Sequence, residues 1–210
     1  YGIDGSDNTR GAGKTIAIVD AYGASTAQTD LNTFARANGL PAITSANFEK
    51  FDQNGGKNYP KDDPDDANGG GWGVEVALDL QAAHAIAPGA KKILITAKTA
   101  SNANLLAAIS TAVNLGADYI SLSFGEGEGD AAFDDIFEQA QENGISIFAS
   151  SGDDGAGVEY PAASEYVVAV GGTTLSKSGS TITETAWSGS GGGCSEYTKA
   201  IPEQKAAAGY

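Results

Sequence analysis

The strongest constraint on the fold is a series of short β-rich apolar runs that alternate with helical segments. The apolar runs cover residues 15–20, 92–96, 118–123 and 145–150. Segments of helical composition flank them near 25–38, 72–87, 102–115 and 130–143. This alternation is typical of parallel strands joined by helices that cover both faces of a sheet. The sequence therefore predicts an α/β fold with a doubly wound, mainly parallel sheet.

Turn and capping residues divide these segments. Ser25 is the predicted N-cap of the first helix, and a second, weaker strand is expected over 42–51. The loop 52–71 is rich in Asp but lacks the alternating pattern and the closing Glu of a calcium loop, so we interpret it as a solvated acidic loop. Beyond residue 160 we expect a strand over 166–171, then a hairpin, and then a glycine-rich, weakly helical tail.

The charge balance excludes several kinds of partner. The 210 residues include 27 acidic and 12 basic side chains, a formal net charge of −15. Nucleic acids and anionic membranes both require a basic face, so neither is expected as a partner. No apolar run approaches the roughly 20 residues that span a bilayer. The single cysteine, Cys194, allows no internal disulfide.

The helical segment 72–87 carries a pair of acids with catalytic potential. Glu75 and Asp79 are one turn apart and so share a helix face, about 5–6 Å apart at Cβ. If both are buried, the pKa of one rises and the pair shares a proton, which gives a carboxylate base with an acid partner. A solvated helix face is the alternative for a bare E-x-x-x-D pattern. The apolar neighbours along this helix favour burial.

A third acid, Asp153, follows the strand 145–150 at a glycine turn. A protonated carboxyl at a strand end can donate a hydrogen bond to a developing oxyanion. From the spacing alone, an aspartate that bonds its own turn backbone is the preferred interpretation.

His84 is the only histidine, and it lies nine residues after Glu75 on the same helix, which is the opposite face. We expect it to be packed near the helix end rather than catalytic. Metal-ligand spacing is absent from the sequence. The stretch 189–195 is interpreted as an extended wall whose backbone can contact a ligand.

Seven segments in the same order resemble the sedolisins, the serine-carboxyl peptidases with a subtilisin-like fold, and their bacterial secreted branch in particular. They are residues 15–22, 73–81, 120–125, 149–153, 160–164, 168–173 and 184–195. The resemblance implies that Glu75 is the general base, that Asp79 orients Glu75, and that Asp153 lines the oxyanion hole. Asp20 stands where some members of the family place another carboxylate of this network, and Phe124 stands where many have tryptophan.

The resemblance also implies parts that these residues do not contain. The nucleophilic serine of the family lies in a Gly-Thr-Ser motif, which does not occur here, and neither Ser151 nor Ser195 takes its place. The calcium site of the family and a disulfide partner for Cys194 are likewise expected beyond residue 210, so no cofactor is expected in this chain.

We therefore expect residues 1–210 to form the first three-fifths of a single mature, secreted catalytic domain. A second chain or fragment would supply the serine and the calcium site, and the substrate would be a peptide or protein. Two alternatives stay open. One is a non-catalytic sedolisin-like binding or structural module that lacks the serine, and the other is an unrelated α/β binding protein.

Overall fold

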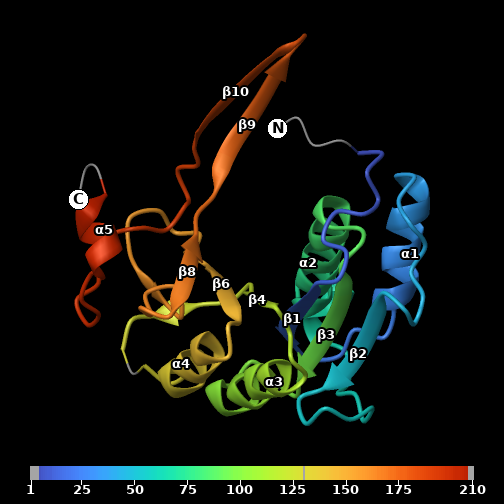
Figure 1. Cartoon of the computed structure of the whole chain (residues 1–210), viewed down its shortest axis with the longest axis horizontal. Coiled ribbons are helices and arrows are strands. Elements are labelled where there is room, and N and C mark those ends of the chain that lie inside the picture. Colours follow the sequence, from blue (N-terminus) through green and yellow to red (C-terminus); the bar gives the residue numbers. More distant parts are fainter. Residues whose placement is uncertain (1–4, 130, 208–210) are drawn as a thin grey trace. The chain divides into compact units, whose positions relative to one another are not determined.

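The computed structural model describes residues 5–129 and 131–207 (Figure 1). The beginning at Tyr1 and the end at Tyr210 lie outside the described residues. The chain forms two compact units. The first contains the residues up to Ser123 together with Glu142–Ser146, and the second contains Phe124–Gln141 together with the residues from Ile147 onward.

Six strands make one sheet in the order β2-β3-β1-β4-β6-β8. Their bounds are β1 Thr15–Ala21, β2 Phe48–Asp52, β3 Lys91–Ala97, β4 Tyr119–Leu122, β6 Ser146–Ser150 and β8 Val167–Val170. The assigned strand pairs of this sheet are parallel, with β1 between β3 and β4. The strands β1 and β3 are almost wholly buried, as expected for parallel strands covered on both faces. The predicted α/β fold class is confirmed.

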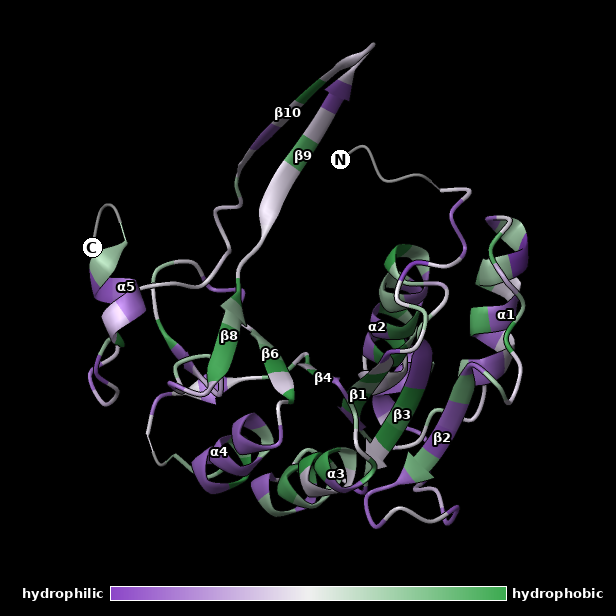
Figure 2. Ribbon diagram, in the orientation of Figure 1, coloured by the Kyte–Doolittle hydropathy of each residue, from purple (hydrophilic) through white to green (hydrophobic). Residues whose placement is uncertain are grey.

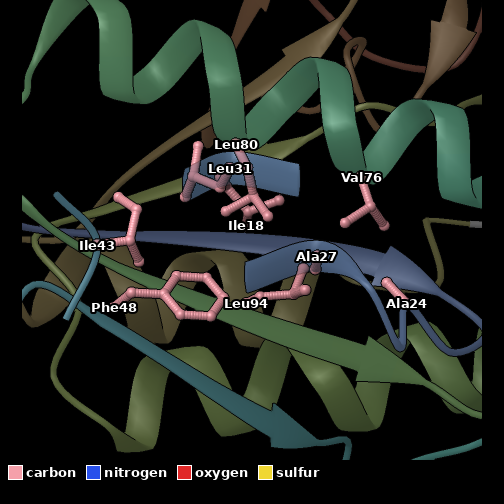
Figure 3. Packing of buried hydrophobic residues seen from close by; sticks show 9 residues of the cluster. All are labelled: Ile18, Ala24, Ala27, Leu31, Ile43, Phe48, Val76, Leu80 and Leu94. Atoms are coloured by element: carbon pink, nitrogen blue, oxygen red, sulfur yellow. The ribbon is translucent and has the colours of Figure 1, made fainter. Parts of the chain in front are cut away.

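Helices cover both faces of the sheet in the first unit. The described helices are α1 Ala27–Ala37, the short 3-10 helix η1 Pro64–Asn68, α2 Trp72–Ile86, α3 Asn102–Asn114, α4 Asp134–Glu142 and α5 Pro202–Ala206. The helices α1 and α2 lie on one face of β1 and β3, and α3 lies on the other (Figures 1 and 3).

The core under α1 and α2 is made by Ile18 and Leu94 of the sheet and by Leu31, Val76 and Leu80 of the helices (Figure 3). These five side chains are at most 1% exposed. Burial of each such side chain stabilises the fold by about 1.5–3 kcal/mol. This core therefore fixes the face that α2 turns toward the sheet.

Three local expectations need correction. The first helix is capped at Thr26 rather than at Ser25, because the Ser25 hydroxyl donates to Asp62 instead. The strand expected over 42–51 begins at Phe48, since the residues before it form a turn. Helix α2 is also less buried than its apolar sequence predicts, with Val74 56% and Leu78 59% exposed.

The second unit has an aromatic core and an exposed hairpin. The ring of Phe133 stacks on Tyr160 at 5.6 Å between centroids and meets the edges of Phe124 and Phe137 at 6.5 and 5.9 Å. The hairpin consists of β9 Thr173–Ser178 and β10 Thr181–Ala186, and a short pair joins β5 Glu126–Gly127 to β7 Glu159–Tyr160. Figure 2 colours β8 as hydrophobic, in keeping with its Val-Val-Ala-Val sequence.

Candidate active site

Helix α2 carries the predicted acid pair, and its N-terminus is capped by the acidic loop before it. Asp63 accepts a hydrogen bond from the backbone N–H of Trp72 (3.1 Å), and Asp66 accepts one from Gly73 (2.8 Å). These carboxylates satisfy N–H groups that have no partner within the helix, and they complement its dipole. The loop expected to be merely solvated therefore determines where α2 begins.

The C-terminus of α2 is held by two basic side chains. Arg10 donates from Nε to the carbonyl of Ile86 at 2.8 Å and from a terminal nitrogen to that of Ala85 at 3.0 Å. The fully buried Lys92 donates from Nζ to the carbonyls of Ala87, Pro88 and Ala90 at 3.3, 3.3 and 2.7 Å. Burial lowers the pKa of Lys92 to about 8. With both ends anchored, α2 holds its acidic side chains in a fixed register.

Strand alternation brings Asp20 under this helix. Ile18 packs against Val76 and Leu80 of α2, and Asp20 points to the same face because side chains alternate along a strand. Asp20 is 0% exposed, and neither of its carboxyl oxygens has a hydrogen-bond partner within the described part of the chain. Burial raises its pKa well above the usual range, and the charges of Asp79 and Glu75 raise it further. Burial without a hydrogen-bond partner therefore favours the neutral form of Asp20.

Glu75, Asp79 and Ser123 complete this cluster. Glu75 and Asp79 are half-buried on one face of α2, one turn apart. The Ser123 hydroxyl lies 2.9 and 2.8 Å from the two carboxyl oxygens of Asp79. Burial is the main reason why the pKa of Asp79 rises to about 6. The hydrogen bond from Ser123 lowers this pKa, whereas the charge of Glu75 and a hydrogen bond between Asp79 and Glu75 raise it. The structure thus brings together Glu75, Asp79 and the more deeply placed Asp20.

Asp153 lies in the second unit, in the turn after β6, and its side chain is exposed. The turn is closed by tight backbone contacts. The amide of Gly191 donates to the carbonyl of Gly152 at 2.8 Å, and a Cβ on Gly191 would lie only 1.8 Å from the carbonyl oxygen of Ser151. Convergence of Asp153 on the Glu75–Asp79 pair stays a prediction.

The glycine-rich segment forms one wall of a cavity within the second unit. The cavity has a volume of about 870 Å³, and Gly192, Gly193, Cys194 and Ser195 line it together with small residues of the sheet such as Ala169. Cys194 is exposed and unpaired. The segment therefore has the extended, wall-like character expected from its composition.

His84 is packed, as expected. Its side chain is 0% exposed, and Nε2 lies 3.0 Å from the carbonyl oxygen of Pro41. Burial lowers its pKa, the charge of Lys92 lowers it further, and the Pro41 contact opposes this. His84 thus reinforces the helix end near Lys92.

The described residues contain no cluster of metal-ligating side chains and no helix able to span a membrane. Within residues 5–129 and 131–207, no three His, Cys, Asp or Glu side chains are grouped to hold a metal ion. In the same part of the chain, every helix is too short or too polar to cross a bilayer.

Sequence reasoning missed two sets of residues at this site. Ser123 follows β4 directly, and β4 lies beside β1, which carries Asp20. A serine and an acid at the carboxyl ends of adjacent parallel strands are therefore a signal that could have identified it. The capping aspartates Asp63 and Asp66 are harder to recognise, because the loop brings them to the helix through its three-dimensional path.

Comparison with known proteins gives a consistent result. The subtilase family model matches residues 11–204. Kumamolisin from Bacillus sp. (strain MN-32) is 33% identical over 198 residues, which are 84% of this chain and 34% of kumamolisin. Sedolisin from Pseudomonas sp. (strain 101) is 32% identical over 212 residues, 88% of this chain and 35% of sedolisin.

The fold agrees with this result. The structure of Pseudomonas sedolisin, a serine-carboxyl proteinase complexed with two molecules of pseudo-iodotyrostatin, matches with a TM-score of 0.81 and 29% identity. That match covers 97% of this chain and 63% of the sedolisin chain. The chain spans about a third of the length of the curated relatives it matches. It belongs to the subtilase family, and the resemblance to the sedolisins is confirmed.

Proposed function

We propose that this chain is part of an acid-acting serine-carboxyl endopeptidase, in which Glu75 is the general base, Asp79 orients Glu75, and Asp153 stabilises the oxyanion. The nucleophilic serine lies outside these 210 residues. The observation that carries the proposal is the acid pair on α2, where burial and Glu75 raise the pKa of Asp79 to about 6. Family membership and the likeness to a serine-carboxyl proteinase support it.

The pair suits general base catalysis in acid. Below about pH 6, Asp79 holds a proton, which it donates to Glu75. Glu75 then takes the proton of the serine hydroxyl as the serine oxygen attacks the peptide carbonyl. The same proton passes to the leaving nitrogen as the C–N bond breaks and the acyl-enzyme forms. Water attacks the acyl-enzyme in the second half of the cycle, again with Glu75 as base.

Asp153 has a separate role in this proposal. A protonated carboxyl at the turn after β6 donates a hydrogen bond to the oxygen on which negative charge develops. Substrates are peptides or proteins, and we propose secretion as the location.

Peptide hydrolysis at acid pH tests these roles in native material that contains the whole enzyme. We expect Glu75→Gln and Asp153→Asn each to lower kcat/KM by about 100-fold or more, since one removes the base and the other an oxyanion donor. Asp154→Asn is the matched control, because Asp154 is the exposed neighbour of Asp153 with no proposed role. Equal activity of Glu75→Gln and wild type would contradict the proposal.

Intact mass spectrometry of the same material tests the proposed partner. We expect a second polypeptide, or a longer chain, that carries a Gly-Thr-Ser segment. If only the 21.1 kDa chain is present and it hydrolyses no peptide, the non-catalytic module is the better account.

A further inference from the structure

Ser123 is held at the carboxyl end of β4 in a position determined by the sheet. In the register of β1 and β4, Ser121 lies opposite Ile18 and Leu122 opposite Val19, so Ser123 comes level with Asp20. Ser121 and Ser123 point to the same face as Ile18 because side chains alternate along an extended segment. That face is covered by α2, and the backbone thus directs the Ser123 hydroxyl toward the helix.

The hydroxyl makes a two-sided contact with Asp79. Its oxygen is 2.9 Å from one carboxyl oxygen and 2.8 Å from the other. A serine hydroxyl has a single proton, so it donates to one of these oxygens at a time. When Asp79 is protonated and donates to Glu75 through one oxygen, the other oxygen remains free to accept from Ser123. The contact therefore persists in both protonation states of Asp79.

We infer that Ser123 is a positioning residue for the acid pair: its hydroxyl fixes the carboxyl plane of Asp79 so that one oxygen stays directed at Glu75. The inference deepens the proposed function and rests on it for its catalytic consequence. Asp20 cannot take this part, because it makes no hydrogen bond to Asp79 in the described structure. Ser123 therefore provides the assigned hydrogen bond that restrains Asp79 from the sheet side.

The direct test is a carboxyl ¹³C NMR titration of Asp79 in native material that contains the whole enzyme. The Ser123 hydroxyl stabilises the charged form of Asp79, so Ser123→Ala is expected to raise the pKa of Asp79 by about 1 pH unit. Ser123→Thr retains the hydroxyl and is expected to titrate like wild type. Ser121→Ala is the matched control, since it removes a hydroxyl from the same face of the same strand.

Ser123→Cys keeps the test decisive if Ser123→Ala fails to fold. A thiol is a weaker donor than a hydroxyl, so the expected shift has the same sign and is smaller. If Asp79 titrates with the same midpoint in Ser123→Ala or Ser123→Cys as in wild type, the inference is overturned.

Hydrolysis supplies a second, separate result in the complete enzyme. We expect Ser123→Ala to lower kcat about tenfold with KM within twofold, to move the alkaline limb of the pH profile upward, and to be rescued by Ser123→Thr. If Ser123→Ala shifts the titration of Asp79 but the wild-type enzyme hydrolyses no peptide, the positioning inference is supported and the proposed function is contradicted. If Ser123→Ala leaves the titration of Asp79 unchanged and the wild-type enzyme is active, the positioning inference is contradicted and the proposed function is supported.

Discussion

The raised pKa of Asp79 predicts a contribution to the free energy of unfolding that is largest in acid. Folding raises the pKa of Asp79 from its ordinary 3.8 to about 6, mainly through burial. Between these values the folded chain binds a proton at Asp79 that the unfolded chain releases, so the contribution of Asp79 to stability is complete below pH 3.8 and falls as the pH rises toward 6. A shift of about two pKa units corresponds to about 3 kcal/mol.

Asp79→Asn removes this dependence, because an amide does not titrate. The free energy of unfolding is measured in urea by circular dichroism at pH 4, 5, 6 and 7 for wild type and variant. We expect wild type to lose about 2.4 kcal/mol more than Asp79→Asn between pH 4 and pH 7, because part of the effect is already lost at pH 4. Subtraction of the two curves removes the contribution of acids that do not interact with Asp79, and leaves that of Asp79 together with its effect on Asp20 and Glu75.

Asp30→Asn is the control for loss of a negative charge, since Asp30 is exposed on α1. It is expected to run parallel to wild type across this pH range. A difference curve between wild type and Asp79→Asn that is flat, or that rises with pH, would refute the reasoning about the buried acid pair.

Three further predictions follow from contacts around the site and the glycine-rich wall. Lys92→Met removes three hydrogen bonds to the carbonyls at the end of α2 and is expected to lower the free energy of unfolding in urea by about 1–3 kcal/mol. Lys91→Met, at an exposed ion pair, is expected to lower it by under about 1 kcal/mol. Equal effects of the two substitutions would contradict the capping role of Lys92. Gly191→Ala places a Cβ on the Ser151 carbonyl and is expected to cost at least about 2 kcal/mol, while Gly192→Ala, with open space around it, changes stability little; a tolerated Gly191→Ala would show that this contact is not tight. In the complete enzyme, kcat/KM is expected to fall as the pH rises through about 6, where Asp79 loses its proton; a rate that rises through this range speaks against a protonated Asp79 in the reaction.

The sequence predicts the sheet well because its strands are short apolar runs whose burial on both faces leaves a clear local pattern. Strand β3, for example, runs one residue beyond the expected 92–96 at each end. Local sequence patterns predict less well the ends of helices and strands that are determined by contacts with distant side chains. The N-cap of α1 is Thr26 rather than the predicted Ser25, because the Ser25 hydroxyl donates a hydrogen bond to Asp62, which is distant in sequence.

The site was predictable in part for the same reason. Glu75 and Asp79 are one helical turn apart, and such a pair is visible in the sequence. Ser123 and the capping Asp63 act through contacts across the fold, which no local spacing encodes. The exposed Val74 and Leu78 show the limit of reasoning from composition, since an apolar helix need not be covered on every face of this chain.

The central claim is that Glu75, Asp79 and Asp153 serve one reaction with a serine from outside these residues. A crystal structure of the complete native material with a bound peptide aldehyde tests it most directly. We expect the serine oxygen to be bonded to the aldehyde carbon, with Glu75 beside that oxygen and Asp153 on the oxygen derived from the aldehyde. An aldehyde bound with Asp153 and Glu75 facing different surfaces would contradict the account.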